Sequence, residues 1–95
     1  MTTSSGSAVL LLETGERVAV GVELGAFSPA GTPEWGGVLR GVPGRVATAM
    51  GMYGWAQLRF HGGEERRIRP EGGPYLDHAG RLLVPFVGEG AIPPG

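Results

Sequence analysis

Residues 6–25, GSAVLLLETGERVAVGVELG, decide the fold because they return 48 positions later as residues 54–73, GWAQLRFHGGEERRIRPEGG. Seven positions are identical in this ungapped alignment, and three of them are glycines. Internal similarity at a fixed shift is typical of a fold built from repeated units. The alignment therefore predicts two copies of one small β unit, over about residues 6–42 and 54–90. It predicts an architecture and no activity.

Each copy has the pattern of a hairpin followed by a third strand. Residues 17–24 alternate between apolar and other side chains, which is typical of a half-buried strand. Glycines at the two turns supply the backbone freedom that a tight hairpin needs. The strands expected from this pattern are residues 8–12, 17–24 and 35–40 in the first copy, and 56–60, 65–70 and 81–87 in the second.

The only stretch with a helical pattern is residues 43–50, where Pro43 suits a first helical position and Val46, Ala49 and Met50 share one face. We therefore expect an all-β fold: a small duplicated six-stranded barrel. Its two β-β-β halves would be related by a pseudo-twofold axis, with at most one short helix near residues 43–50. A compact sandwich is the alternative, and we favour the barrel because closure removes free strand edges.

The length of 95 residues indicates a single domain. We expect a flexible N-terminus over residues 1–7, one β domain over residues 8–90 and an extended tail over residues 91–95. The chain has no cysteine, which excludes disulfides and thiolate metal sites. The apolar run at residues 8–12 is too short for a signal peptide or a membrane helix, so we expect a cytoplasmic protein.

The charge of the chain gives no general attraction to nucleic acid or to anionic membranes, because the net charge is −1. All eight basic residues are arginine. We interpret this as the codon usage of a GC-rich bacterial genome rather than as selection for guanidinium chemistry.

Catalytic and metal chemistry have few candidate residues. Asp77 and His78 could form an acid–base pair, but neighbouring residues in an extended chain point apart, and the chain has no cysteine and no serine after Ser28 to act as a nucleophile. His61 with the glutamates at 64 and 65 is better explained as a charged turn than as a metal site. We expect no enzyme, no metal and no cofactor.

An arginine-bearing hairpin is the basis of one alternative function, the binding of single-stranded nucleic acid. Arg59, Arg66, Arg67 and Arg69 fall on two neighbouring strands, close to aromatic residues that could stack on bases. Nearby glutamates almost cancel this charge, so we favour cross-strand ion pairing. Binding of nucleic acid is therefore expected to be the weaker possibility.

A second alternative is a small-ligand binder or an accessory enzyme subunit, with a pocket near Trp35, Met52 and Trp55. The segment from 51 to 55 places a sulfur atom and two aromatic rings between glycines. The competing interpretation is that this segment closes one end of the barrel core.

The two copies differ most at the first strand, which is apolar on both faces. Val9 and Leu11 occupy the face on which the second copy has Gln57 and Arg59. A second apolar face must be covered, either by another molecule or by residues 43–50 or 88–95 of the same chain. Our leading hypothesis is a non-catalytic interaction or assembly module, a homodimer or a binder of another protein, that uses Val9 and Leu11.

Overall fold

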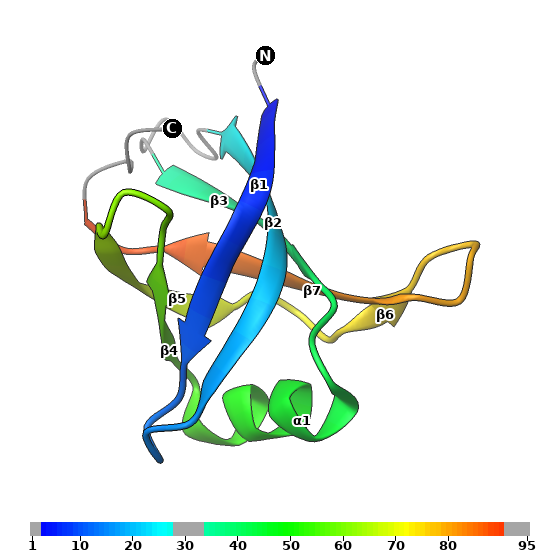
Figure 1. Cartoon of the computed structure of the whole chain (residues 1–95). Helices are drawn as coiled ribbons and strands as arrows, with labels where there is room; N and C mark the ends of the chain where they lie inside the picture. The colour runs from blue at the N-terminus through cyan, green and yellow to red at the C-terminus, as the bar shows by residue number, and fades with distance from the viewer. Residues whose placement is uncertain (1–2, 28–33, 91–95) are drawn as a thin grey trace.

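The computed structural model describes residues 3–27 and 34–90, which fold into strands and one helix (Figure 1). The elements, in chain order, are β1 (Thr3–Leu11), β2 (Arg17–Phe27), β3 (Glu34–Arg40), α1 (Gly44–Tyr53), β4 (Ala56–Arg59), β5 (Glu65–Pro70), β6 (Tyr75–Leu76) and β7 (Leu82–Gly88).

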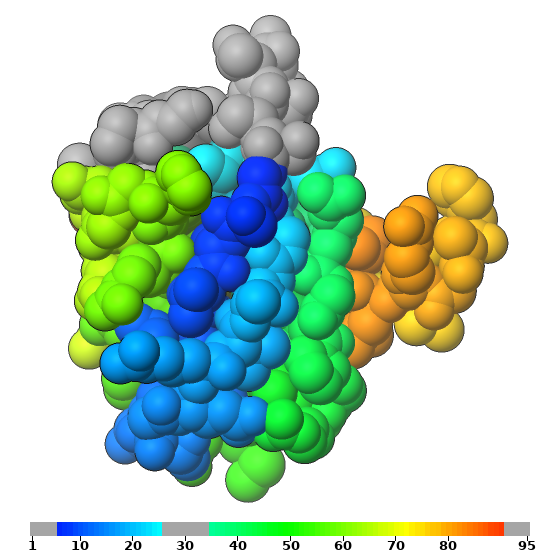
Figure 2. Space-filling model, viewed as in Figure 1, coloured from blue at the N-terminus to red at the C-terminus, as the bar shows by residue number. Residues whose placement is uncertain are grey.

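Six of the strands form a closed antiparallel barrel, which confirms the predicted fold class. Their order is β3-β2-β1-β4-β5-β7, and β3 pairs back onto β7 to close the ring. Within the described residues β6 lies outside this ring and pairs with β7 alone. The β6–β7 hairpin, residues 75–83, stands away from the barrel and is called the arm below (Figures 1 and 2).

The core fills the barrel and is closed at one end by α1. The largest fully buried side chains come from five strands and the helix: Phe86, Leu10, Leu39, Met50, Leu58, Ile68 and Val46. Full burial of a side chain of this size contributes about 1.5–3 kcal/mol. No polar or charged side chain is buried among the described residues. The interior is therefore a packed apolar core with no polar group available for chemistry.

Strand pairing between the two halves of the chain matches residues that are equivalent in the two sequence copies. Leu10 of β1 pairs with Leu58 of β4, and these residues are equivalent in the sequence alignment. Val38 of β3 pairs with Pro85 of β7, which are equivalent if the shift is one residue shorter. Strand pairing therefore agrees with a pseudo-twofold arrangement, and the duplication itself stays a prediction.

The two hairpin turns of the halves have the same backbone geometry. The N–H of Leu12 donates to the carbonyl of Glu16 at 2.9 Å, and at the equivalent turn the N–H of Phe60 donates to the carbonyl of Glu64 at 2.7 Å. A glycine with φ of +93°, a conformation that disfavours other residues, stands at position 15 in one turn and at position 63 in the other. One of the three glycine pairs that the alignment matched thus has the same role in both turns.

Element boundaries differ from the prediction by more than one residue at four places. β2 continues to Phe27, beyond its expected end at residue 24. β1 begins at Thr3 because the long β2 offers backbone partners back to Gly25, and such pairing needs no apolar side chains. α1 continues past Gly51 and stops at Gly54, whose left-handed φ of +82° and N–H bond to the carbonyl of Met50 end the helix. The segment after Pro74, expected as a loop, contains β6. The predicted tail, residues 91–95, lies outside the described residues.

Candidate functional site

Val9 and Leu11 lie half-buried on the outer face of β1. Val9 is flanked by Ala19 of β2 and Arg59 of β4, whereas Leu11 is flanked by polar residues of the same two strands. The alternation along β1 sends Leu10 into the core and these two side chains outward. The structure therefore places both residues on one surface of the barrel.

A shallow groove of about 310 Å³ runs beside Val9. Its wall comes from β1, β2 and the end of β4 with the following turn: Ser7, Ala8, Val9, Ala19, Arg59, Phe60 and His61. Most of this surface is apolar, and Arg59 and His61 are among the polar residues that line it. The groove gives Val9 a small apolar depression with a polar margin.

The edge of β1 beside this groove is open before Val9. β4 pairs with β1 from Val9 to Leu11, so residues 3–8 have no strand partner on that side within the described part of the chain. A methyl group added to Gly6 would meet nothing within 4 Å. Unpaired edges attract other strands, and proteins usually protect them with charges or proline. Residues 3–12 contain neither.

Neither of the two predicted internal covers reaches this surface in the part of the chain that the structure describes. α1 buries its apolar side in the barrel core. After β7, the N–H of Glu89 donates to the carbonyl of Arg67, and the indole of Trp35 donates to the carbonyl of Gly90, so the chain runs beside β5 and Trp35. Figure 2 shows β1 at the surface of the barrel.

Three of the four arginines proposed for nucleic-acid binding are paired with glutamates. The pairs are Arg59 Nε with Glu65 Oε2 at 2.7 Å, Arg66 Nη1 with Glu64 Oε2 at 3.0 Å, and Arg69 Nε with Glu89 Oε2 at 3.6 Å. A phosphate would have to compete with these carboxylates. Arg59 and Glu65 form a cross-strand ion pair of the kind that the sequence favoured, whereas Glu64 lies two residues before Arg66 and Glu89 follows β7.

The fourth arginine, Arg67, lies over the ring of Trp55, with its guanidinium carbon 4.4 Å from the ring centroid. This is a cation–π contact, and it covers the aromatic face that base stacking would need. Trp55 itself is half-buried at the start of β4.

The structure does not bring Trp35, Met52 and Trp55 into one cavity. Trp35 is buried in the core against Phe60 and Phe86. Met52 lies at the end of α1 with 81% of its surface exposed. β3 starts at the end of the barrel opposite to α1, which separates Trp35 from Met52 (Figure 1).

Asp77 has a local structural role at the turn of the arm. Its carboxylate accepts the backbone N–H groups of Ala79 and Arg81, each at 2.9 Å. The N–H of Arg81 is the main reason that the pKa of Asp77 lies below its ordinary value. His78 is exposed beside it. This geometry caps a turn and does not orient the histidine.

The described residues contain neither a cluster of metal-ligating side chains nor a helix that could span a membrane. Within residues 3–27 and 34–90, no group of three or more His, Cys, Asp or Glu residues could hold a metal ion. No helix of the described chain is long and apolar enough to cross a membrane.

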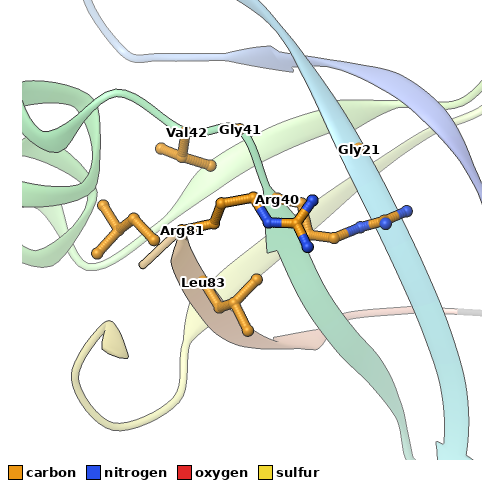
Figure 3. A pocket seen from close by; sticks show the side chains of 7 residues that line it. Gly21, Arg40, Gly41, Val42, Arg81 and Leu83 are labelled. Carbon is orange, nitrogen blue, oxygen red and sulfur yellow. The ribbon is translucent and has the colours of Figure 1, made fainter. Parts of the chain in front are cut away.

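A second cavity lies where the arm leaves the barrel, and the sequence analysis missed it (Figure 3). Its volume is about 400 Å³, and its wall comes from β2, β3, β7 and the adjoining turns: Gly21, Arg40, Gly41, Val42, Arg81, Leu82 and Leu83. We call it the arm-side pocket. Its residues come from distant parts of the chain, and only the lateral register of the strands brings them together.

One sequence signal could have pointed to the arm-side pocket. Gly21 lies within β2 on the same face as Ala19 and Glu23, and a glycine within a strand often marks the close approach of another group. That group is Arg40, whose Nε would lie 3.5 Å from a methyl group added to Gly21. In Figure 3 the side chain of Arg40 extends toward Gly21.

Comparisons with known proteins do not assign this chain to a family. No protein-family model, no curated protein and no solved structure matches it. The candidate sites must therefore be judged on their own geometry.

Proposed function

We propose that this protein is a non-catalytic assembly module that associates with a second copy of itself through β1. The observation that carries the proposal is the open edge of β1 beside the outward-facing Val9 and Leu11. Both features lie on one strand, and the described residues leave both accessible.

The open edge supports pairing between two identical strands. A twofold axis would place β1 of one copy antiparallel to β1 of the other, and the same surface then serves both partners. The backbone of residues 3–7 would supply the hydrogen bonds. The segment has no charge to repel its counterpart and no proline to remove a donor. The two barrels would join into one continuous sheet.

The side chains of Val9 and Leu11 add an apolar contribution. Full burial of an aliphatic side chain contributes about 1.5–3 kcal/mol, and less than half of each of these side chains is exposed, so covering the exposed part adds at most about 1 kcal/mol per residue. The groove beside Val9 offers room for a side chain of the second copy. Backbone pairing and this contact together make the face self-complementary.

The other two functions have less support. The arginines of β4 and β5 are paired with glutamates or stacked on Trp55, and the three residues of the expected ligand pocket lie apart. We place the module in the cytoplasm, where a domain without cysteine loses nothing under reducing conditions.

Sedimentation velocity over a range of protein concentrations tests the proposal. We expect a dimer whose dissociation constant rises at least tenfold, or about 1.4 kcal/mol, in Val9→Glu and Leu11→Glu, because each variant places a charge in the interface. Leu83→Glu is the matched control, since Leu83 is also half-buried and outward-facing but lies on β7. A wild-type protein that stays monomeric at all concentrations would refute the proposal.

A further inference from the structure

The arm-side pocket lies in a lateral row of residues that crosses four strands on the outer face of the barrel. Gly21 of β2 is opposite Arg40 of β3, Arg40 is opposite Leu83 of β7, and Leu83 is opposite Tyr75 of β6. Laterally paired residues share one face of a sheet. Across the sheet, the row therefore runs from a glycine to a cation, then to an aliphatic side chain and finally to an aromatic ring.

The charge of this pocket is positive. Arg40 is exposed and makes no ion pair with any described residue, whereas Arg81 shares its charge with Asp77 at 3.4 Å. None of the lining residues is acidic. Arg40 and Arg81 both line the pocket, and their side chains are drawn in Figure 3. A guanidinium beside an apolar wall is well suited to bind a carboxylate through two parallel hydrogen bonds.

The apolar part of the surface extends beyond the pocket onto the arm. Tyr75, which is 48% exposed, shares the outward face of Leu83, whereas Leu76 is opposite Leu82 on the other face of the arm. Tyrosine, arginine and apolar groups in one patch are typical of the energetically important part of protein interfaces. The arm holds this patch away from the rest of the barrel.

The size of the row indicates what kind of ligand would cover it. Adjacent strands are about 4.8 Å apart, so the row from Gly21 to Tyr75 spans roughly 14 Å. A small organic anion would fill the pocket and leave Tyr75 uncovered. An extended peptide, at about 3.3 Å per residue, covers the row with four or five residues.

From this geometry we propose that the arm-side pocket binds an extended peptide segment of a partner protein in which an acidic residue stands two positions from a large apolar one, so that both side chains point to the same side. The acidic side chain pairs with Arg40, and the apolar side chain packs on Leu83 and Tyr75. This site lies on different strands from the β1 interface and does not depend on self-association.

The test uses the full chain and a defined panel of five-residue peptides. Each peptide carries a central Leu, Ile, Phe, Tyr or Trp with Asp or Glu at its first and fifth positions, so that these side chains share one side of the extended chain. Its neutral counterpart carries Asn or Gln at those two positions. Binding is measured by titration calorimetry and by amide shifts in NMR spectra. We expect at least one acidic peptide to bind and to shift the amides of the arm. Its neutral counterpart should bind at least tenfold more weakly.

Three variants test the residues. Arg40→Glu and Leu83→Glu should each weaken binding at least tenfold. Gly21→Val should also weaken binding at least tenfold, because its side chain fills the pocket beside Arg40. The added Cβ itself meets Arg40 at an ordinary contact distance. Arg17→Glu is the matched control for the charge, because Arg17 is also exposed and makes no ion pair with a described residue. It should change binding less than twofold.

Several results would overturn the inference. The absence of binding by every acidic peptide would do so, as would equal binding of the neutral peptides or indifference to Arg40→Glu. Free phenylacetate that binds as tightly as the best peptide would assign the pocket to a small anion instead. The result is independent of the dimer test, because Leu11→Glu should leave peptide binding unchanged while it disrupts self-association.

Discussion

The outer faces of the β1–β2 and β4–β5 hairpins are the most instructive comparison in this molecule. Their inward positions are alike, since Leu10 and Leu58 are both fully buried and are paired with each other on the adjacent strands β1 and β4. Their outward positions differ, with Val9 and Leu11 on β1 and polar residues at the equivalent positions of β4. Burial in a shared core constrains the inner face, whereas the outer face can specialise.

The two hairpins also differ in length, and this difference produces the open edge. β1 has 9 residues and β4 has 4, so β4 covers only the last part of β1. Arg59 and Arg66 of the β4–β5 hairpin form ion pairs with Glu65 and Glu64 of the same hairpin. The longer hairpin therefore has an unpaired, uncharged edge, and the shorter one has a satisfied, polar surface.

The largest expected effect tests the likeness of the inner faces. Leu10→Ala and Leu58→Ala should each lower the free energy of unfolding by about 2–5 kcal/mol, because each opens a cavity in the same layer of the core. Urea denaturation measures both changes. The double variant should deviate from additivity, since the two residues are direct neighbours. If only one of the two single variants loses less than about 1 kcal/mol of unfolding free energy, the two halves do not contribute equally to the core.

A smaller effect is expected at the equivalent turns. Gly15→Ala and Gly63→Ala should each lower the free energy of unfolding by about 1 kcal/mol or somewhat more, because alanine disfavours the positive φ that both turns adopt. Thermal and urea denaturation of both variants, compared with wild type, measure this cost. Gly51→Ala is the control, since Gly51 lies within α1, where alanine is favoured. If the two variants lose free energy of unfolding by amounts that differ more than twofold, the two turns are not energetically equivalent.

Much of the fold could be predicted because it depends on short-range patterns. Alternation along residues 17–24 and glycines at the turns are local signals, and the internal alignment related the halves to each other. The start of β1 could not be predicted from apolar residues, because backbone pairing with β2 extends it. The outward position of Val9 could be predicted from the alternation of residues along one strand. The arm-side pocket could not be predicted in this way, because Gly21, Arg40 and Leu83 meet only through the register of three strands.

The polar surface of the β4–β5 hairpin offers a more subtle test. Arg67 stacks on Trp55, whereas the equivalent position of β2 is Ala19, which has no such contact. Arg67→Gln should lower the free energy of unfolding by about 0.5–1 kcal/mol, the usual contribution of an exposed cation–π contact. Arg17→Gln is the control, because Arg17 has no aromatic contact in the described chain. If Arg67→Gln and Arg17→Gln lower the free energy of unfolding equally, the contact between Arg67 and Trp55 does not stabilise the fold.

The smallest expected effect concerns acid stability at the first hairpin turn. Arg45 Nη1 donates a hydrogen bond to Glu16 Oε1 at 2.9 Å, and this bond is the main reason that the pKa of Glu16 lies below its ordinary value of 4.5. Because the pKa is depressed in the folded state, the stabilisation is complete above pH 4.5 and is lost as the pH falls through the lowered value. Glu16→Gln should therefore weaken the loss of stability on acidification below pH 4.5, as followed by urea denaturation at stepwise lower pH. Glu13→Gln, in the same turn but without an ion pair among the described residues, should follow the wild type. If both variants follow the wild type, the acid sensitivity of the barrel originates elsewhere, and the carboxylate of Asp77 at the turn of the arm, whose pKa is also lowered, becomes the group to replace next.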